Sequence, residues 1–446
     1  MKPRSPYPPV LIVAAAVEAA VLVAFACVRS RGWTYGADSG TFAQAILNAP
    51  AGMGDGFEGA SHYRFHFSPI LSLLYPLVAI TRSLLALQIA QILLVVGAVF
   101  AYYSLVVPHL GRRLSSMLGI LALLYAPLPA LAFSEFHELA FAPLLVFLML
   151  GAIDRRRWAF YAIFGGLAIC VREDVALIVA VFGVVVAVAG VLARDRERAI
   201  AGAFTIAAPL AVLTAYVELI LPHVGSWRPA HFYIYGREGA TPASLVGRGT
   251  YLLETFVPLA LLPFLTRWLW LAVPGLSVVL LANSGLVWRM GMHYTALWLP
   301  WMLVAVAAGV RYARDRWGES VAKRWTGLAM GLCALTLVVA NPMHLGHYLH
   351  PSYGDLASAK RALACVPLSA SLATHDEWYA ATALERPRAT VGMFHRVEYY
   401  VFADDYPNDE FRAKTLPELR ASTGTTYREI CRFGAVAAYR RTGATE

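Results

Sequence analysis

Charged side chains are scarce in this chain. Of 446 residues, 15% are Asp, Glu, Lys or Arg, whereas 59% are hydrophobic, and the mean hydropathy is +0.57. Soluble domains carry about 25% charged residues, so this composition excludes an ordinary water-soluble protein. Several apolar runs, such as 10–28 and 84–107, approach the ~20 residues that a helix needs to cross a bilayer. The sequence therefore predicts an α-helical, polytopic membrane protein.

Cysteine is also rare, and no pair of the five has zinc-ribbon spacing. Cys27, Cys170 and Cys333 fall in or near apolar runs, where a thiol behaves as a small apolar side chain. Cys365 and Cys431 fall in the C-terminal tail, and the sequence leaves open whether they form a disulfide. The tail also lacks a glycine-rich phosphate loop before a helix, and no internal repeat is evident. A nucleotide-binding unit is therefore not expected there.

The net charge of +9 comes from Lys and Arg in short clusters between apolar runs. This distribution is typical of cytoplasmic loops, so we expect no nucleic-acid partner. Lys2 and Arg4 precede the first run and predict a cytoplasmic N-terminus, and that run resembles a retained anchor more than a cleaved signal. If all the basic clusters are cytoplasmic, about eleven transmembrane helices follow, near 10–29, 84–107, 114–132, 138–153, 158–171, 174–192, 199–221, 252–266, 268–283, 293–312 and 325–342.

Two parts of different character follow from this map. Residues 1–342 are expected to form the transmembrane domain, and in its first loop (30–83) the stretch 66–80 is expected to lie as a helix at the outer membrane surface. Residues 343–446 are expected to form a small soluble α/β domain outside the cytoplasm. Its predicted elements are strands near 370–374, 390–394 and 399–403, a helix near 376–384, and a closing pair of strands within 427–441.

Polar and ionisable side chains gather in the predicted outer loops, whereas the predicted cytoplasmic loops are short and merely basic. Charges at a membrane boundary are typical of a functional site facing the periplasm or cell exterior. The outer positions include Asp38, "SEFHELAF" at 134–141, "CVREDVAL" at 170–177, the loop 222–251 and the turn 283–294.

The order of Asp38, "HFSPILSLLYPL", "SEFHELAFAPLL" and "REDVAL" resembles the bacterial membrane-protein family called domain of unknown function 2079 (DUF2079). "MHYTALWLPWML" and "PLSASLATHDEW" extend this resemblance over nearly the whole chain. More distantly, the layout is similar to the lipid-dependent glycosyltransferases of the C fold (GT-C), including protein O-mannosyltransferases and the aminoarabinose transferase. The resemblance implies a cell-envelope enzyme of the bacterial inner membrane that moves a sugar from a polyprenyl-phosphate donor to an acceptor on the periplasmic face.

The resemblance also implies an acidic centre. Asp38 corresponds by position to the essential acid of the first outer loop in those transferases, and the alternative is a helix N-cap. Glu135 and Glu138 are expected three apart on one helix face, with His137 pointing elsewhere. Their alternative is a favourable interaction with a helix dipole. A divalent metal held by Asp38, Glu135 and Glu138 is compatible with the sequence but not required by it.

Arg172 is the candidate for binding the donor phosphate, because a planar guanidinium at headgroup depth suits a lipid phosphate. The alternatives are an internal pair with Glu173 or Asp174, or snorkelling to the interface. His66 and His293 are further candidates for the phosphate site, and each is equally explained as an interfacial anchor. His137, Glu173, Asp174 and Tyr294 are expected to support the site.

Two other classes of function stay open. A transporter would explain the many spans, but it should carry polar residues near the bilayer midplane, often in two related halves. A noncatalytic scaffold or sensor would explain the soluble tail but not the acid clusters in separate loops. The gathering of charge at one face favours the transferase.

Overall fold

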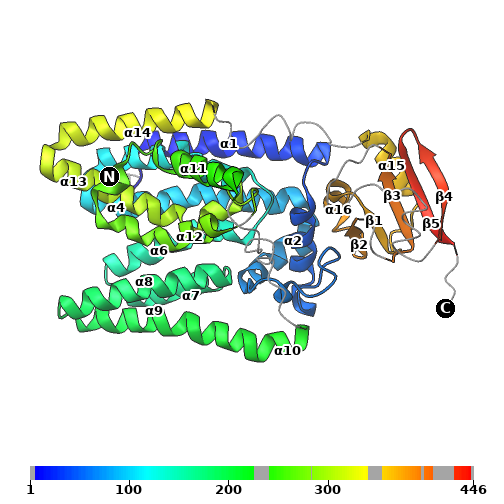
Figure 1. Ribbon diagram of the computed structural model, residues 1–446, viewed down its shortest axis with the longest axis horizontal. Coiled ribbons are helices and arrows are strands. Elements are labelled where there is room, and N and C mark those ends of the chain that lie inside the picture. The colour runs from blue at the N-terminus through cyan, green and yellow to red at the C-terminus, as the bar shows by residue number, and fades with distance from the viewer. Residues whose placement is uncertain are drawn as a thin grey trace, which may run out of the picture. The chain divides into compact units, whose positions relative to one another are not determined.

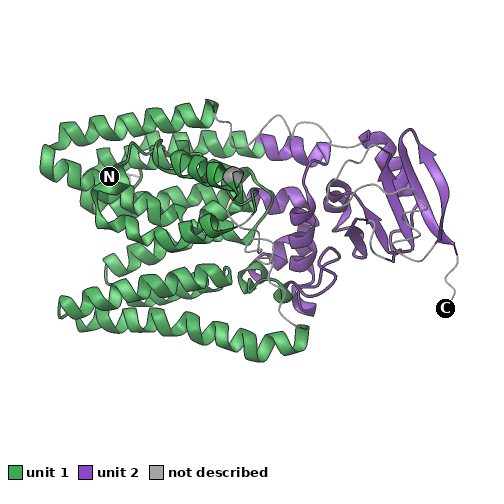
Figure 2. Cartoon of the chain, in the orientation of Figure 1, with its two compact units in different colours: residues 1–23, 63–71, 90–343 green, residues 24–62, 72–89, 344–446 purple. Residues whose placement is uncertain are grey.

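The computed structural model describes residues 6–225, 241–282, 284–339, 354–392, 396–404 and 426–442. Lys2, Arg4, residues 226–240 of the loop 222–251, and the expected boundary at 342/343 lie outside these ranges. The chain divides into two compact units, which Figure 2 colours separately. Unit 1 consists of residues 1–23, 63–71 and 90–343, and unit 2 of residues 24–62, 72–89 and 344–446.

Unit 1 is helical (Figure 1). Many of its helices expose large apolar side chains. Apolar side chains on the outer surface of a bundle are expected where lipid replaces water. Its helices are α1 (Pro9–Gly32, continuing into unit 2), α4 (Leu84–Leu124, beginning in unit 2), α5 (Pro127–Phe133), α6 (Phe141–Asp154), α7 (Trp158–Ile169), α8 (Glu173–Leu192), α9 (Arg196–Ala215), α10 (Leu221–Val224), α11 (Pro242–Phe256), α12 (Val273–Leu281), α13 (Leu299–Trp317) and α14 (Glu319–Val339).

Short helical segments connect these helices and carry several of the residues discussed below. They include 3-10 turns at His62–Arg64, Pro69–Leu74, Glu138–Ala140, Leu262–Leu265, Arg267–Leu271 and His293–Leu297, and a π-helical turn at Tyr216–Ile220.

Five helices among the described residues are long and apolar enough to cross a membrane: Pro9–Gly32, Leu84–Leu124, Glu173–Leu192, Arg196–Val224 and Glu319–Val339. The total of eleven crossings stays a prediction. The break expected between 107 and 114 is present inside α4, where two helices meet at a kink: Gly111 leaves the helical conformation (φ 74°, ψ 168°), three residues after Pro108. The span expected at 114–132 is itself interrupted, because α4 ends at Leu124 and α5 begins at Pro127. The span expected at 252–266 is wrong, because α11 ends at Phe256 and turns follow.

Helices α8 and α9 form a tightly packed hairpin (Figure 1). A Cβ atom added at Gly202 would lie 2.2 Å from the backbone nitrogen of Ala187, and one at Gly190 would lie 2.4 Å from that of Ala199. Small residues of this kind let two apolar helices approach backbone to backbone. Packing against α9 holds α8 in position, and the first turn of α8 carries two residues of the candidate site.

Unit 2 contains helices α2 (Ala37–Leu47), α3 (Tyr75–Thr81), α15 (Leu356–Ala364) and α16 (Asp376–Thr382) and a five-stranded sheet. The strands are β1 (Leu372–Thr374), β2 (Ala389–Val391), β3 (Tyr399–Ala403), β4 (Thr426–Phe433) and β5 (Val436–Thr442), in the spatial order β2-β1-β3-β5-β4. β1 is parallel to β2 and β3, whereas β5 is antiparallel to β3 and β4. The strands and helix predicted in the tail are confirmed.

A disulfide joins Cys365, directly after α15, to Cys431 in β4, 66 residues further along the chain. The two cysteines pack against an apolar core that includes Leu372, Trp378 and Val401. The first loop belongs to the same unit, because α2 packs against α16 so closely that a Cβ at Gly40 would lie 2.9 Å from the Cα of Ala380. The stretch 66–80 is helical as expected, in the turn Pro69–Leu74 and in α3.

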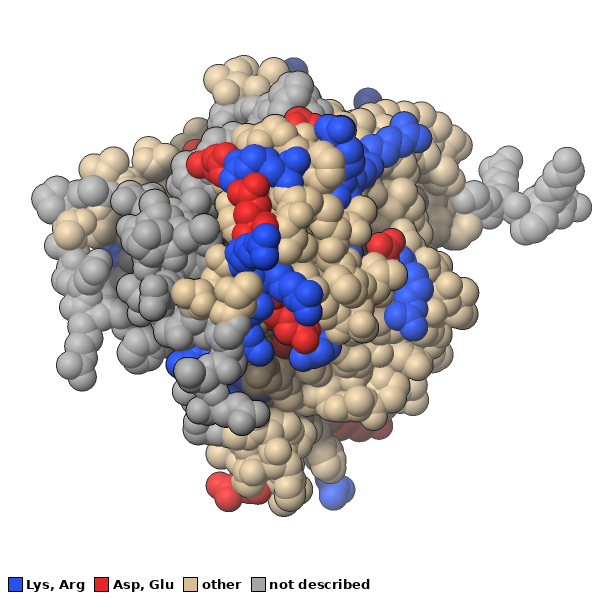
Figure 3. Space-filling model, turned by 90° about the vertical axis from the view of Figure 1, so that its right-hand side faces the viewer, with Lys and Arg blue, Asp and Glu red and all other residues tan. Residues whose placement is uncertain are grey.

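Basic and acidic side chains are interspersed on the face drawn in Figure 3. Beside the C-terminal sheet, Arg432 of β4 forms ion pairs with both Asp404 and Glu429. Mixed charges of this kind are typical of a surface in contact with water.

Candidate functional site

Seven ionisable side chains lie buried together in unit 1, although water is the preferred environment of such groups. They come from four segments that are distant in the sequence, and each is between 0 and 8% exposed. This set, called the buried network below, consists of His66, His137, Glu138, Arg172, Glu173, Asp174 and His293.

Arg172 is the centre of the buried network. It is the N-cap residue of α8, and its extended backbone (φ −166°, ψ 156°) turns the side chain back toward the helix start. Its Nε atom donates to both carboxylate oxygens of Asp174, at 2.9 and 3.1 Å, and its Nη1 atom lies 3.4 Å from Glu138 Oε1. Burial opposes the charge, but Asp174, Glu138 and Glu173 together raise the pKa of Arg172 above its ordinary value. The guanidinium therefore stays charged.

Glu173 fixes the orientation of His66. Its Oε1 atom lies 2.9 Å from His66 Nδ1, and its Oε2 atom accepts a hydrogen bond from the backbone N–H of Phe67 at 2.9 Å. Because both carboxylate oxygens are engaged, the imidazole has one defined orientation. A carboxylate that binds Nδ1 in this way is the arrangement by which enzymes set the tautomer of a histidine base.

His137 and His293 stack face to face, with ring centroids 3.5 Å apart. The Nδ1 atom of His137 also lies 2.8 Å from Glu138 Oε2. Tyr294 completes this side, with its ring 4.2 Å from His293 and 5.6 Å from the Arg172 guanidinium carbon.

The buried network contains more negative than positive formal charge. Glu138, Glu173 and Asp174 supply three carboxylates and Arg172 one cation, so the sum is −2 when the histidines are neutral. Paired imidazoles and carboxylates are among the groups that general acid–base chemistry uses.

Gln91, in α4, holds the segment that carries Glu138. Its Nε2 atom donates to the carbonyl oxygens of Leu131 and Glu135, at 3.1 and 3.3 Å, and its Oε1 atom accepts from the backbone N–H of His137 at 2.8 Å. Gln91 was not among the residues predicted from the sequence. The signal was an amide side chain within a long apolar run, where polar groups are rare unless bonded to a neighbouring segment.

The chain matches the family model described as "Predicted membrane protein (DUF2079)" over residues 34–410. It belongs to the DUF2079 family. This confirms the resemblance noted in the sequence, and the matched range includes the whole buried network. No curated protein matches the chain significantly.

The solved structures similar to this DUF2079 protein include two of ArnT from Cupriavidus metallidurans. The structure bound to undecaprenyl phosphate has a TM-score of 0.57 at 12% identity, and the match covers 97% of this chain and 98% of that one. The apo structure has a TM-score of 0.50 at 13% identity, with coverage of 96% and 98%. At these identities the likeness shows the fold alone, which is the ArnT-like GT-C fold.

Some local expectations for the DUF2079 protein are corrected by the structure. Glu135 and Glu138 do not share a helix face, because helical structure begins only at Glu138 and Glu135 precedes it in a bend. His137 does not point elsewhere but contacts Glu138. The helix-cap alternative for Asp38 is wrong, since Gly36 is the N-cap of α2 and Asp38 lies half-buried in its first turn.

The predicted site residues are therefore brought together only in part. Arg172 forms the internal pair with Asp174 that was one of its alternatives, and at 1% exposure it does not snorkel. His66, His137, Glu138 and His293 join it in the buried network. Asp38 belongs to unit 2, so its partnership with Glu135 and Glu138, including a shared metal ion, stays a prediction.

Proposed function

We propose that this protein is a membrane glycosyltransferase that moves a sugar from a polyprenyl-phosphate donor to an acceptor. The observation that carries the proposal is the buried network, which lies in a chain that shares its fold with ArnT, a protein crystallised with undecaprenyl phosphate. Acid–base pairs and a guanidinium within one buried cluster are the groups that such a transfer needs.

In the proposed reaction, an acceptor oxygen or nitrogen attacks the anomeric carbon of the sugar. The bond from that carbon to the phosphate oxygen breaks, and polyprenyl phosphate leaves with the electron pair. The acceptor's proton passes to a carboxylate, for which Asp38, Glu135 and Glu138 are the candidates. No redox partner is needed.

Arg172 is proposed to bind the phosphate through Nη1. Asp174 holds the Nε edge of the guanidinium through short hydrogen bonds, whereas the contact from Nη1 to Glu138 is long at 3.4 Å. A phosphate oxygen that replaces Glu138 at Nη1 would release this carboxylate for proton transfer. His293, whose Nε2 atom is buried without a hydrogen-bond partner among the described residues, would add a hydrogen-bond donor, and His66 would add a second imidazole to the phosphate site.

The site is proposed to face the periplasm, with the N-terminus in the cytoplasm and the C-terminal domain, residues 343–446, outside the bacterial inner membrane. The Cys365–Cys431 disulfide supports this orientation, because structural disulfides persist mainly in oxidising compartments.

The test is sugar transfer by the purified full chain in detergent or lipid nanodiscs. A panel of polyprenyl-phosphate sugars would be supplied, and released polyprenyl phosphate and sugar-labelled product would be measured. We expect Glu138→Gln, which removes a proposed proton acceptor, and Glu173→Gln, which breaks the pair with His66, each to reduce turnover by about 100-fold or more. Asp154→Asn is the matched control, because it breaks a histidine–carboxylate pair of similar length, with His109 at 3.0 Å, outside the buried network.

Flux of an intact lipid or sugar across proteoliposomes, without release of polyprenyl phosphate, would replace the proposal with the transporter alternative. Equal turnover in Glu138→Gln, Glu173→Gln and Asp154→Asn would remove the buried network from the mechanism.

A further inference from the structure

The loop before His62 in unit 2 folds back on itself. An antiparallel bridge joins Gly54 to Ser61, and the backbone N–H of His62 donates to the carbonyl oxygen of Met53 at 2.9 Å. The residues between these contacts form a turn. One Asp and one Glu within it and the His at its end, all types of metal ligand, are brought close together by this backbone.

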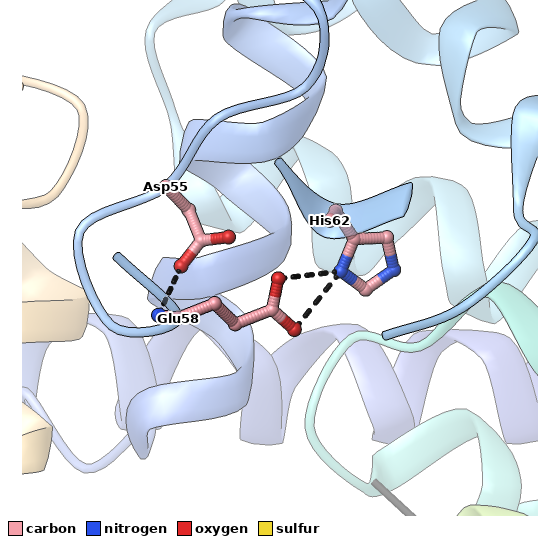
Figure 4. A group of neighbouring side chains, drawn as sticks. All are labelled: Asp55, Glu58 and His62. Atoms are coloured by element: carbon pink, nitrogen blue, oxygen red, sulfur yellow. Dashed lines mark hydrogen bonds and ion pairs between the residues drawn. The ribbon is translucent and has the colours of Figure 1, made fainter. Parts of the chain in front are cut away.

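These three side chains are Asp55, Glu58 and His62, and they point toward one another (Figure 4). One ligand-type atom from each lies within 4.8 Å of the other two. His62 Nδ1 is 3.1 Å from both carboxylate oxygens of Glu58. Asp55 is 9% exposed and His62 1%. The cluster is thus a compact, largely buried set of one imidazole and two carboxylates.

Asp55 supplies an independent sign of a missing ligand. Its Oδ1 atom accepts a hydrogen bond from the backbone N–H of Glu58 at 2.7 Å. Its Oδ2 atom is directed into the space beside Glu58 and His62 and has no hydrogen-bond partner in the part of the chain that the structure describes. A buried carboxylate oxygen is normally bonded, and a second carboxylate nearby adds repulsion. A cation placed between the three side chains would bind the Oδ2 atom of Asp55 and offset the repulsion between the two carboxylates.

We propose that Asp55, Glu58 and His62 bind a divalent transition-metal ion of the zinc type. One imidazole nitrogen and two carboxylate oxygens are ligands that Zn²⁺ accepts, with water in the fourth position. Ca²⁺ and Mg²⁺ prefer oxygen alone. The spacing of 3.1 Å between His62 Nδ1 and the Glu58 oxygens is close to the ~3.3 Å edge of a tetrahedron with bonds of about 2 Å.

The ion would have a structural effect that is separate from sugar transfer. The ring of Phe42 in α2 packs edge-on against His62, with centroids 5.2 Å apart. Within the same turn, Gly56 donates to Gln44 Oε1 at 2.7 Å and accepts from Thr390 Oγ1 at 2.6 Å. The loop therefore fastens α2 to the C-terminal sheet within unit 2. An ion that binds only the folded loop stabilises this arrangement by mass action.

Zinc binding to the full-length chain tests the proposal. The protein, made without a polyhistidine tag and stripped with a chelator, would be titrated with Zn²⁺ by calorimetry and with Co²⁺ by visible absorption. We expect one high-affinity Zn²⁺ per chain, a rise in melting temperature on binding, and at least tenfold weaker binding in Asp55→Asn and His62→Gln. Glu429→Gln, an exposed acid of unit 2, and His109→Gln are matched controls and should bind as the wild type does.

Zinc-edge X-ray absorption on the wild type keeps the test independent of variant folding. The expected first shell contains one imidazole nitrogen and otherwise oxygen. A shell with sulfur or with several imidazoles, the absence of one-to-one binding, or equal affinity in Asp55→Asn, His62→Gln and the controls would overturn the proposal.

Discussion

Glu138 Oε1 lies 3.4 Å from Arg172 Nη1, and neither side chain is more than 1% exposed. The two residues come from separate segments of the chain, so the pair holds the start of α8 against the segment before α6. Each charge is tolerated in this dry environment only because the other is present. The buried network is therefore a structural element as well as a proposed catalytic one.

Replacing Arg172 should destabilise the protein strongly. Arg172→Gln would leave Glu138 and Asp174 buried without a cation, and breaking a buried pair in this way costs about 3–5 kcal/mol. Arg172→Lys keeps the charge but loses the two-point contact with Asp174, so its effect should be intermediate. Denaturant unfolding in detergent micelles would measure both. Arg156→Gln, at an exposed arginine that also has a carboxylate partner, is the control, and equal destabilisation by Arg156→Gln and Arg172→Gln would contradict this account.

Gln91 should matter to activity without belonging to the reacting groups. Gln91→Leu would leave the backbone N–H of His137 buried and unbonded, which costs about 1–3 kcal/mol, and would loosen the segment that carries Glu138. We expect lower turnover with an unchanged optimum pH, because no titrating group is removed. Gln91→Glu keeps the acceptor for His137 and should recover part of the turnover. Wild-type turnover in Gln91→Leu would show that the segment needs no such support.

The Cys365–Cys431 disulfide should stabilise unit 2. Because it closes a loop of 66 residues, its removal should lower the free energy of unfolding by about 4 kcal/mol on the chain-entropy model. The double variant Cys365→Ala/Cys431→Ala, compared by denaturant unfolding with Cys170→Ala, which removes a free cysteine, measures this effect. A double variant as stable as Cys170→Ala would mean that the bridge contributes nothing in solution.

Local patterns in the sequence predicted the local structure well. The long apolar runs at 10–29 and 174–192 became α1 and α8, and the alternating tail segments became β1, β3 and the β4–β5 hairpin. The family resemblance, carried by short motifs such as "SEFHELAF", predicted the GT-C fold. These successes share a cause, because periodicity and motifs are properties of neighbouring residues.

The contacts between distant segments of the chain could not be predicted from the sequence. Nothing in "REDVAL" indicates that Glu173 binds His66, 107 residues earlier, while Asp174 binds Arg172. The interruption of the span expected at 114–132, between the end of α4 at Leu124 and the start of α5 at Pro127, was likewise not predicted. The three ligands Asp55, Glu58 and His62 were visible within eight positions of the sequence, but their burial was not.

His375 should make the stability of unit 2 depend on pH. The ring is buried, lies edge-on against Trp378 with centroids 4.3 Å apart, and accepts a hydrogen bond at Nε2 from the backbone N–H of Ala403 at 2.8 Å. Burial lowers the pKa of His375 well below 6.5. At pH values between that lowered pKa and about 6.5, His375 is protonated in the unfolded chain but not in the folded chain. The contribution of His375 is therefore complete above about pH 6.5 and is lost as the pH falls below it.

Thermal or denaturant unfolding of the full chain between pH 8 and pH 5 measures this dependence. Below about pH 6.5, one such histidine reduces stability by at most about 1.4 kcal/mol per pH unit. His375→Gln keeps an acceptor for Ala403 but cannot take up a proton, so we expect its stability to fall less steeply than that of the wild type. His223→Gln, at an exposed position, should leave the slope unchanged. Identical slopes for the wild type and His375→Gln would mean that the folded protein accepts the proton on this buried ring, against the packing of Trp378 and the Ala403 hydrogen bond.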